Sequence, residues 1–184
     1  MAHINVPEGV PGIRSLVMFR PESGKFLYEL AQVLLRGESP LTEAERELIA
    51  TYVSSRNDCM FCMSSHAAAA RYLFKDNKQV VDIVLNDYQS APISDKLKAL
   101  LTIAGHVQQN GKAVTDDDIA QARKHGATDR DIHDTVLIAA TFCMFNRYVD
   151  GLGSLTPTDP AAYEEMGKRL GEKGYALPAP ALQN

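Results

Sequence analysis

The sequence predicts an all-α protein built as one helical domain, and three observations lead to this prediction. Apolar residues recur at helical spacing along most of the chain, capping residues precede these segments, and the alternation typical of strands is almost absent. The 184 residues suffice to bury the core of one domain. We expect about eight helices in a helical domain over residues 22–175, after an extended N-terminal arm over residues 1–21 and before a frayed tail over residues 176–184.

The first segments follow from local sequence signals. Residues 1–21 contain three prolines and two glycines and show no sustained hydrophobic period, which indicates an extended arm. An apolar stripe that stops at Gly37 predicts the first helix and consists of Phe26, Leu27, Leu30, Val33 and Leu34. Thr42 and Glu45 form a capping box, so a second helix is expected to run to about Ser55.

The remaining six helices are placed in the same way. Asp58 is the expected N-cap of a third helix, and a short fourth helix follows from about Asn77. The last four helices are each preceded by a capping residue, namely Ser94, Thr115, Thr128 and Asp159. A chain with helical signals in every segment after the arm is expected to fold as a helical bundle.

Composition excludes several classes of partner. Nineteen Lys and Arg residues stand against 23 Asp and Glu residues, which gives a net charge of −4 and no basic block for nucleic acid. The longest nearly apolar stretch, Val136 to Phe145, is about half the ~20 residues that a membrane span needs. The N-terminus has neither the basic nor the apolar region of a signal peptide, so a cytoplasmic protein without membrane contact is expected.

The residues with chemical potential gather around a C-x-x-C motif. Cys59, Cys62 and His66 are spaced at i, i+3 and i+7, so they share one face of the predicted third helix. Cysteines in the first turn of a helix lie near unpaired amides, which lower the thiol pKa. Glu47 lies 12 residues before Cys59 on the preceding helix and comes within reach if the two helices fold against each other.

Which sulfur is more acidic stays open at the level of local electrostatics. Closeness to the helix terminus favours Cys59, whereas closeness to His66 favours Cys62. A structural zinc site is an alternative use of the same residues, but a four-ligand zinc site would have to recruit Glu47 as well.

Other polar or reactive residues receive simpler interpretations. Cys143 lies on an apolar stripe and is expected to be a small buried hydrophobic residue. Asn146, Arg147 and Asp150 are spaced to form a polar cluster that braces the long seventh helix, and we favour this over a catalytic role.

The pattern E-x11-C-x2-C-x3-H, formed by Glu47, Cys59, Cys62 and His66, resembles the active-site pattern of the alkyl hydroperoxidase D and carboxymuconolactone decarboxylase superfamily. The residues between and around these four are similar to its peroxidase-related subgroup. Further similar stretches cover residues 11–14, 19–22, 145–150 and 166–170, so the resemblance extends from about residue 7 to residue 175. One departure is Phe61, because some alkyl hydroperoxidases have a histidine before the second cysteine.

The resemblance implies a thiol-dependent peroxidase that needs no metal or other cofactor. It makes Cys62 the peroxidatic cysteine, Cys59 the resolving cysteine, and Glu47 and His66 the proton relay. The implied partners are a hydroperoxide, an external dithiol or thiol reductant, and further copies of the chain in a trimer or hexamer. Two alternatives are a decarboxylase or lactone-processing enzyme of the same superfamily, and a redox-sensing oligomer without enzymatic activity.

Overall fold

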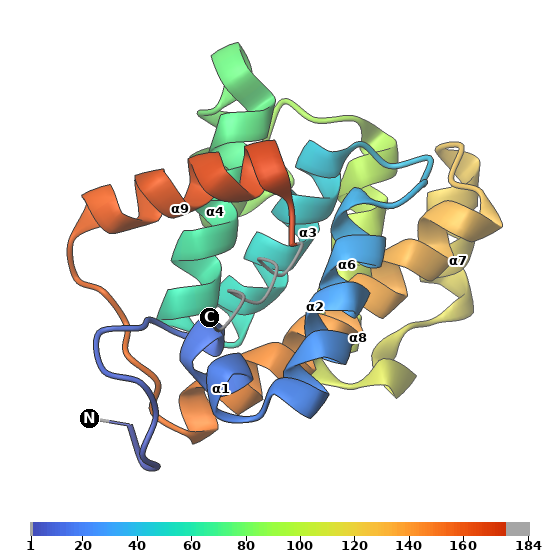
Figure 1. Cartoon of the computed structure of the whole chain (residues 1–184). Coiled ribbons are helices and arrows are strands. Elements are labelled where there is room, and N and C mark those ends of the chain that lie inside the picture. Colours follow the sequence, from blue (N-terminus) through green and yellow to red (C-terminus); the bar gives the residue numbers. More distant parts are fainter. Residues whose placement is uncertain (1, 176–184) are drawn as a thin grey trace.

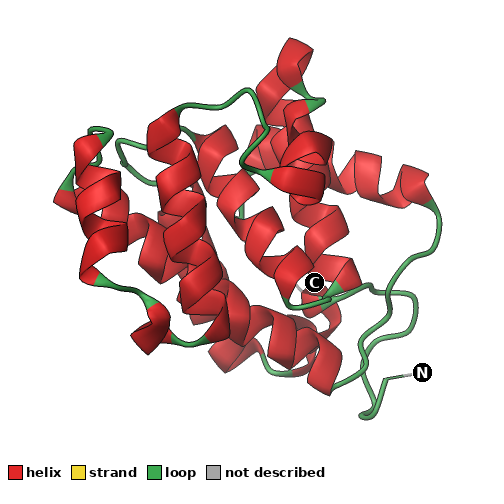
Figure 2. Cartoon of the chain, turned by 180° about the vertical axis from the view of Figure 1, so that it is seen from behind, coloured by secondary structure: helices red, strands yellow, loops and turns green. Residues whose placement is uncertain are grey.

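The protein is described here by a computed structural model that covers residues 2–175. This part of the chain consists of helices joined by loops and contains no strand (Figures 1 and 2). Its nine α-helices are α1 Ile13–Phe19, α2 Pro21–Arg36, α3 Glu43–Arg56, α4 Met60–Phe74, α5 Val80–Asp87, α6 Asp95–Gln109, α7 Asp116–Lys124, α8 Asp129–Gly151 and α9 Pro160–Lys173. The prediction of an all-α fold is therefore confirmed.

Capping chemistry begins most of the helices where the sequence places them. Thr42, Thr115 and Thr128 each accept a hydrogen bond from the backbone three residues later and complete a capping box at the start of α3, α7 and α8. The side chains of Ser94 and Asp159 likewise cap α6 and α9. Because these bonds satisfy amides that have no partner inside the helix, they fix the register of each helix start.

The segment expected to be extended, residues 1–21, contains the additional helix α1 at residues 13–19. Leu16 is fully buried, and the Ser15 hydroxyl donates a 2.8 Å hydrogen bond to the carbonyl of Gly12. The prolines and glycines of this segment flank α1 rather than interrupt it, so two turns of helix form and are held by packing on the core. The expected tail over residues 176–184 lies outside the described residues.

Helix α2 turns a different face to the core than its apolar stripe suggests. Phe26 and Val33 are 67% and 64% exposed, whereas Ala31, Leu34 and Leu35 are buried. The assignment of Phe26 and Val33 to the buried stripe is therefore wrong. The rotation leaves the half-buried side of α2, with Leu27 and Tyr28, facing the cavity described below.

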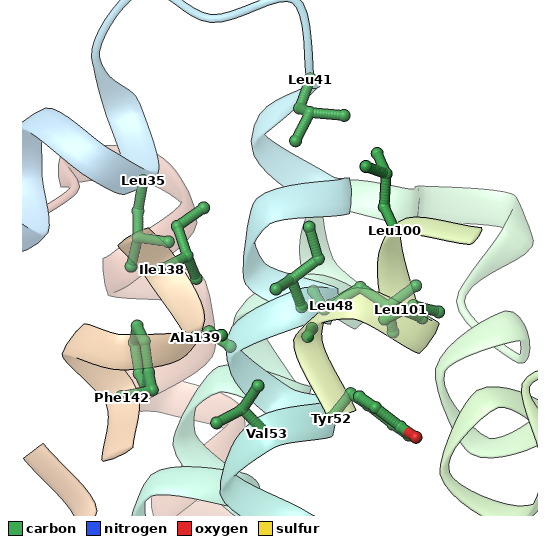
Figure 3. Close-up of a cluster of buried hydrophobic side chains, with 14 of the residues drawn as sticks. Leu35, Leu41, Leu48, Tyr52, Val53, Leu100, Leu101, Ile138, Ala139 and Phe142 are labelled. Carbon is green, nitrogen blue, oxygen red and sulfur yellow. The ribbon is translucent and has the colours of Figure 1, made fainter. Parts of the chain in front are cut away.

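Helix α3 is the centre of the fold. All residues from Arg46 to Ser54 are buried, because α4, α6 and α8 pack around this helix. Leu48 lies between Leu101 on α6 and the α8 residues Ile138 and Phe142 (Figure 3). Fully burying a leucine contributes about 1.5–3 kcal/mol, so this layer fixes α3, and with it Glu47, rigidly.

The last helix brings a distant part of the chain back to the site. Helix α9 lies against α4 (Figure 1), and the chain after α9 places Tyr175 in the core beside α2 and α3. Within residues 2–175, no helix combines the length and the apolar character needed to cross a membrane.

Candidate functional site

The site is built on the turn between α3 and α4. The chain reverses at Asn57 and Asp58, and Asp58 adopts a left-handed backbone with φ 56°, which Asp tolerates better than most residues. The Asn57 amide donates a 2.8 Å hydrogen bond to Asn146 on α8 and so ties the turn to the core. The expectation that Asp58 caps the next helix is wrong, because the residue at the N-cap of α4 is Cys59.

Because α4 begins one residue later than expected, the two cysteines occupy different positions in the structure. Cys59 lies at the cap and is completely buried, whereas Cys62 is the third residue of α4 and 4% exposed. Both are free thiols. The Cys59 thiol donates a 3.3 Å hydrogen bond to Asp150 Oδ1 on α8. A hydrogen bond with Cys62, burial, the charge of Cys62 and the hydrogen bond to Asp150 together raise the pKa of the Cys59 thiol strongly.

Glu47 is a fully buried carboxylate with three partners. Its Oε1 accepts hydrogen bonds from Arg36 Nη2 at 2.6 Å and from the Tyr175 hydroxyl at 2.7 Å, and its Oε2 lies 2.7 Å from His66 Nδ1. Burial acts to raise the pKa of Glu47, but His66, Arg36 and Tyr175 together outweigh it and hold this pKa below its ordinary value. Glu47 is therefore a stable anion at neutral pH.

The ionised state of Glu47 fixes the state of His66. A carboxylate only accepts hydrogen bonds, so the Nδ1 atom of His66 carries a proton, and in the neutral ring Nε2 is then the unprotonated nitrogen. The ring is held between the edge contact with Phe142, at a centroid distance of 4.5 Å, and the nearly parallel ring of Tyr175 at 5.9 Å. His66 is thus oriented with a free basic nitrogen.

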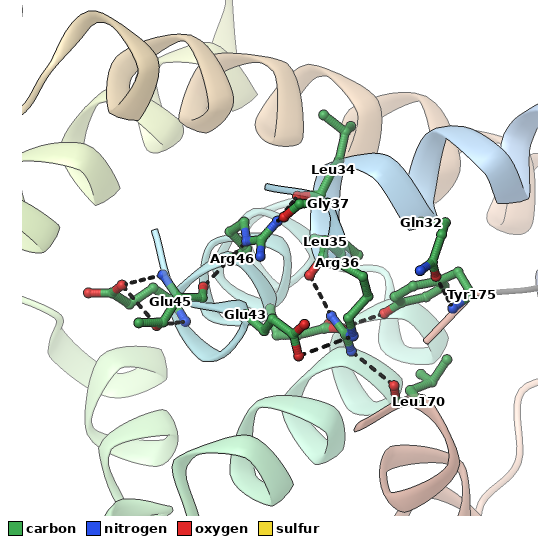
Figure 4. Close-up of polar contacts among 12 residues, drawn as sticks. Gln32, Leu34, Leu35, Arg36, Gly37, Glu43, Glu45, Arg46, Leu170 and Tyr175 are labelled. Carbon is green, nitrogen blue, oxygen red and sulfur yellow. Dashed lines mark hydrogen bonds and ion pairs between the residues drawn. The ribbon is translucent and has the colours of Figure 1, made fainter. Parts of the chain in front are cut away.

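Arg36 and Tyr175 are site residues that the sequence analysis missed. Arg36 also donates to the carbonyl of Leu170 and lies 5.2 Å from the centre of the Tyr175 ring (Figure 4). Burial raises the pKa of Tyr175 well above its ordinary value, and the Glu47 carboxylate adds to this effect, so the hydroxyl stays a hydrogen-bond donor. Neither residue belongs to a local motif, and only the return of the chain after α9 brings Tyr175 here.

A cavity of about 330 Å³ opens beside this network. Cys62, His66 and Tyr175 lie in its wall, together with side chains from α1, α2, α8 and α9, whereas Cys59 does not line it. The wall includes Phe61, whose ring packs against Gly12 so closely that a Cβ on Gly12 would lie 1.9 Å from it. Of the two cysteines of the C-x-x-C motif, Cys62 is therefore the one that lines the cavity.

The polar residues of the long helix α8 make different contacts from those that the sequence analysis predicts. Asn146 does bind across to α3, because its amide donates to the Ser54 hydroxyl at 3.0 Å. Asp150, assigned in the sequence analysis to a bracing cluster, instead accepts the hydrogen bond from Cys59. Arg147 is exposed and donates to the carbonyl of Cys143, one turn earlier, so these residues do not form one cluster.

No group of three His, Cys, Asp or Glu side chains within residues 2–175 is arranged to hold a metal ion. Glu47 and His66 face one another, while Cys59 turns to Asp150, so the four residues do not converge on one point. The geometry is that of a dithiol beside a carboxylate–imidazole pair.

Comparisons with known proteins show which family this all-helical chain belongs to. Residues 21–88 match the Carboxymuconolactone decarboxylase family. The fold is similar to that of an uncharacterized peroxidase-related protein from Silicibacter sp. TM1040, with TM-score 0.75, 30% identity, and coverage of 84% of this chain and 79% of that one. No curated protein matches the chain.

Two further structures agree with this result. The alkylhydroperoxidase AhpD core of an uncharacterized peroxidase-related protein from Ralstonia eutropha JMP134 has TM-score 0.79 and 26% identity over 91% of this chain and 96% of that one. A protein of unknown function from Agrobacterium tumefaciens shares the fold, with TM-score 0.69 and 21% identity over 86% of this chain and all (100%) of that one. The chain belongs to the alkyl hydroperoxidase D and carboxymuconolactone decarboxylase superfamily.

Proposed function

We propose that the protein is a thiol-dependent peroxidase in which Cys62 attacks the hydroperoxide and Cys59 resolves the product. The observation that carries this proposal is the division between the sulfurs: Cys62 lines the cavity beside His66, whereas Cys59 is buried outside it with a raised pKa. The attacking form of a cysteine is the thiolate, so a sulfur held as a buried thiol is poorly suited to the first step. The names of the structural relatives point in the same direction.

The first step uses the imidazole as acid and base. His66 Nε2 takes the proton of the Cys62 thiol, and the thiolate attacks the terminal oxygen of the hydroperoxide. The O–O bond breaks, the sulfur becomes a sulfenic acid, and the alkoxide leaves as an alcohol after receiving the proton from His66. The Glu47 carboxylate, bound to Nδ1, stabilises the imidazolium between the two transfers.

The second step forms the disulfide. The Cys59 sulfur attacks the Cys62 sulfenic acid, the S–O bond breaks, and water leaves as an S–S bond forms. The Cys59 proton passes to Asp150, the acceptor of its hydrogen bond, and from there to the departing hydroxide, which leaves as the water molecule. An external dithiol then reduces the disulfide by thiol–disulfide exchange and is itself oxidised to a disulfide.

The proposal is tested by a thiol count before and after one equivalent of cumene hydroperoxide. The wild type is expected to lose two of its three thiols. Cys62→Ser should lose none, and Cys59→Ser should give a sulfenic acid that dimedone traps. Cys143→Ser is the matched control, because Cys143 does not line the cavity, and it should react like the wild type. Oxidation of Cys62→Ser at the wild-type rate would disprove the assignment.

A further inference from the structure

We propose that the cavity beside Cys62 accepts organic hydroperoxides that carry a carboxylate in addition to an apolar body. The reaction of such a compound rests on the proposed peroxidase function, whereas the binding of its carboxylate and its body does not. The inference depends on the composition of the cavity wall and on two arginines at its rim.

The wall of the cavity is mainly apolar and selects an organic body. It includes large side chains from four different helices, namely Leu27, Phe61, Phe142, Phe145, Met166 and Leu170. Its volume of about 330 Å³ lies at the lower end of the ~300–1,000 Å³ that is usual for pockets binding small organic molecules. Hydrogen peroxide, which is close to water in size, would leave most of this apolar surface without contact, whereas a ring or a short alkyl chain would cover it.

Two guanidinium groups interrupt this apolar wall. Arg14 on α1 and Arg169 on α9 both line the cavity, and both are exposed, which places them at its rim. Burial raises the pKa of Tyr28, also in the wall, and Arg169 and Arg14 oppose this effect. Both cations line the same cavity as this phenol, although α1 and α9 are far apart in the sequence.

The two arginines have no anionic partner among the residues described. Arg36, Arg71 and Arg123 each form an ion pair, but no ion pair or side-chain hydrogen bond to a residue within 2–175 involves Arg14 or Arg169. Glu165 lines the same cavity, one helical turn before Arg169, without lying within ion-pair distance of either arginine. The rim thus holds two positive charges against one negative charge.

This charge balance favours a monoanionic ligand. Guanidinium groups bind carboxylates through paired, charge-assisted hydrogen bonds, which are stronger than neutral ones. A dianionic phosphate ester would meet the Glu165 carboxylate at the same rim, and the like charges would repel each other. With the carboxylate at the rim and the apolar body in the cavity, the hydroperoxide group points to Cys62 and His66 in the wall.

The test compares cumene hydroperoxide with its para-carboxylate derivative, since the two differ only in the charged group. We expect the wild type to show about a tenfold or larger kcat/KM for the carboxylate, which matches one charge-assisted hydrogen bond. In the double variant Arg14→Gln with Arg169→Gln, the ratio of the two kcat/KM values should fall to about one. Arg20→Gln is the control, because Arg20 is an exposed arginine between α1 and α2 that does not line the cavity.

A binding measurement separates this inference from the proposed reaction. The alcohol formed from the carboxylate derivative is titrated by calorimetry into the wild type and the double variant, where we expect about tenfold weaker binding to the variant. Equal binding to both, or equal kcat/KM for the two peroxides, overturns the inference and leaves the peroxidase proposal standing. Binding that depends on the arginines, without reduction of either peroxide, supports the inference and disproves the peroxidase. Tighter binding of the corresponding phosphate ester overturns the choice of a monoanion.

Discussion

Tyr175 donates a 2.7 Å hydrogen bond to Glu47, which lies 128 residues earlier in the chain, and its hydroxyl is 3.1 Å from His66 Nδ1. This contact links the last described residue of the chain to the α3–α4 pair at the centre of the fold. It also completes the set of donors around the buried carboxylate, in which Arg36 supplies the charge and His66 supplies the proton-carrying ring.

Tyr175→Phe tests whether this hydroxyl supports the proposed relay. The ring and its packing remain, but Glu47 loses one donor, and we expect a stability loss of about 1–3 kcal/mol in urea unfolding. In the wild type, the hydrogen bond from Tyr175 lowers the pKa of Glu47 and helps to hold His66. Its loss should therefore slow the peroxide reaction several-fold. Tyr72→Phe is the matched control, since Tyr72 bonds only Glu172 at the surface. Equal rates for Tyr175→Phe and the wild type would limit Tyr175 to a structural role.

Glu47→Gln removes the anion but keeps a side chain of similar shape. We expect the peroxide reaction at pH 7 to slow by ~10²- to 10⁴-fold, because His66 loses the charge that stabilises its protonated form. Both sulfurs remain, so a strong oxidant should still form the Cys59–Cys62 disulfide. Raising the pH toward the ordinary thiol pKa of about 8.5 should partly restore the rate. A rate equal to that of the parent at pH 7 would exclude Glu47 from the relay.

The same variant leaves the buried Arg36 guanidinium without its closest counter-charge. The Arg36 side chain is only 6% exposed, and its remaining acidic neighbour, Glu43, is 3.7 Å away. Removing one partner of a buried ion pair costs about 3–5 kcal/mol, and we expect the lower end, because Gln can still accept a hydrogen bond. Urea unfolding at pH 7 measures this loss.

The pH dependence of stability provides an independent check on Glu47. Its pKa is lower in the folded protein than in the unfolded chain, so ionised Glu47 stabilises the fold above the unfolded pKa of about 4.3. This stabilisation is lost as the pH falls through the folded pKa. The wild type should therefore lose stability faster than Glu47→Gln between about pH 5 and pH 2. Parallel curves for the two proteins would show that the folded pKa of Glu47 is not lowered.

Asp150→Asn separates the two chemical steps. We expect the first reaction of Cys62 with peroxide to be unchanged, because Asp150 contacts Cys59 and does not line the cavity. Disulfide formation should slow about tenfold or more, since the acceptor of the Cys59 proton has lost its charge. Stopped-flow measurements with dimedone trapping should then show accumulated sulfenic acid. A slower first step with an unchanged second step would contradict this role.

The sequence predicts most of the helices because their start signals are local. Thr42, Thr115 and Thr128 carry both halves of a capping box within four residues, so each helix start is specified without tertiary contacts. Helix α1 is not predicted by local start signals, since residues 13–19 lack a capping side chain and are held by the burial of Leu16. The exposure of Phe26 and Val33 on α2 is not predicted either, because periodicity alone does not say which apolar side chains contact the core.

As with the helices, the sequence predicts only those parts of the candidate site that local spacing specifies. The spacing of Glu47, Cys59, Cys62 and His66 anticipates the contact between Glu47 and His66, because a tight turn places α3 against α4. The sequence does not indicate Arg36 and Tyr175, and it assigns Asp150 to a bracing cluster, since each reaches the site from another helix or from the segment after α9. Local spacing carries no information on such contacts.

Gly12→Ala tests how the N-terminal segment shapes the cavity. Gly12 adopts φ 56°, where a side chain costs about 1–2 kcal/mol, and an added Cβ would lie 1.9 Å from the Phe61 ring. Either the ring or α1 must move, which adds about 1–3 kcal/mol. We expect a total loss of about 2–5 kcal/mol in urea unfolding, with weaker binding of cavity ligands, because Phe61 and Arg14 both line the cavity.

Gly9→Ala is the matched control for this prediction. Gly9 also has a positive φ, of 70°, but nothing lies within 4 Å of a Cβ added there. It should therefore cost only the backbone strain of about 1–2 kcal/mol and leave the cavity unchanged. The difference between the two variants measures the contact between Gly12 and Phe61. If both variants lose the same stability and bind cavity ligands equally well, this contact does not hold α1 against the site, and the cavity wall must be fixed by the other helices.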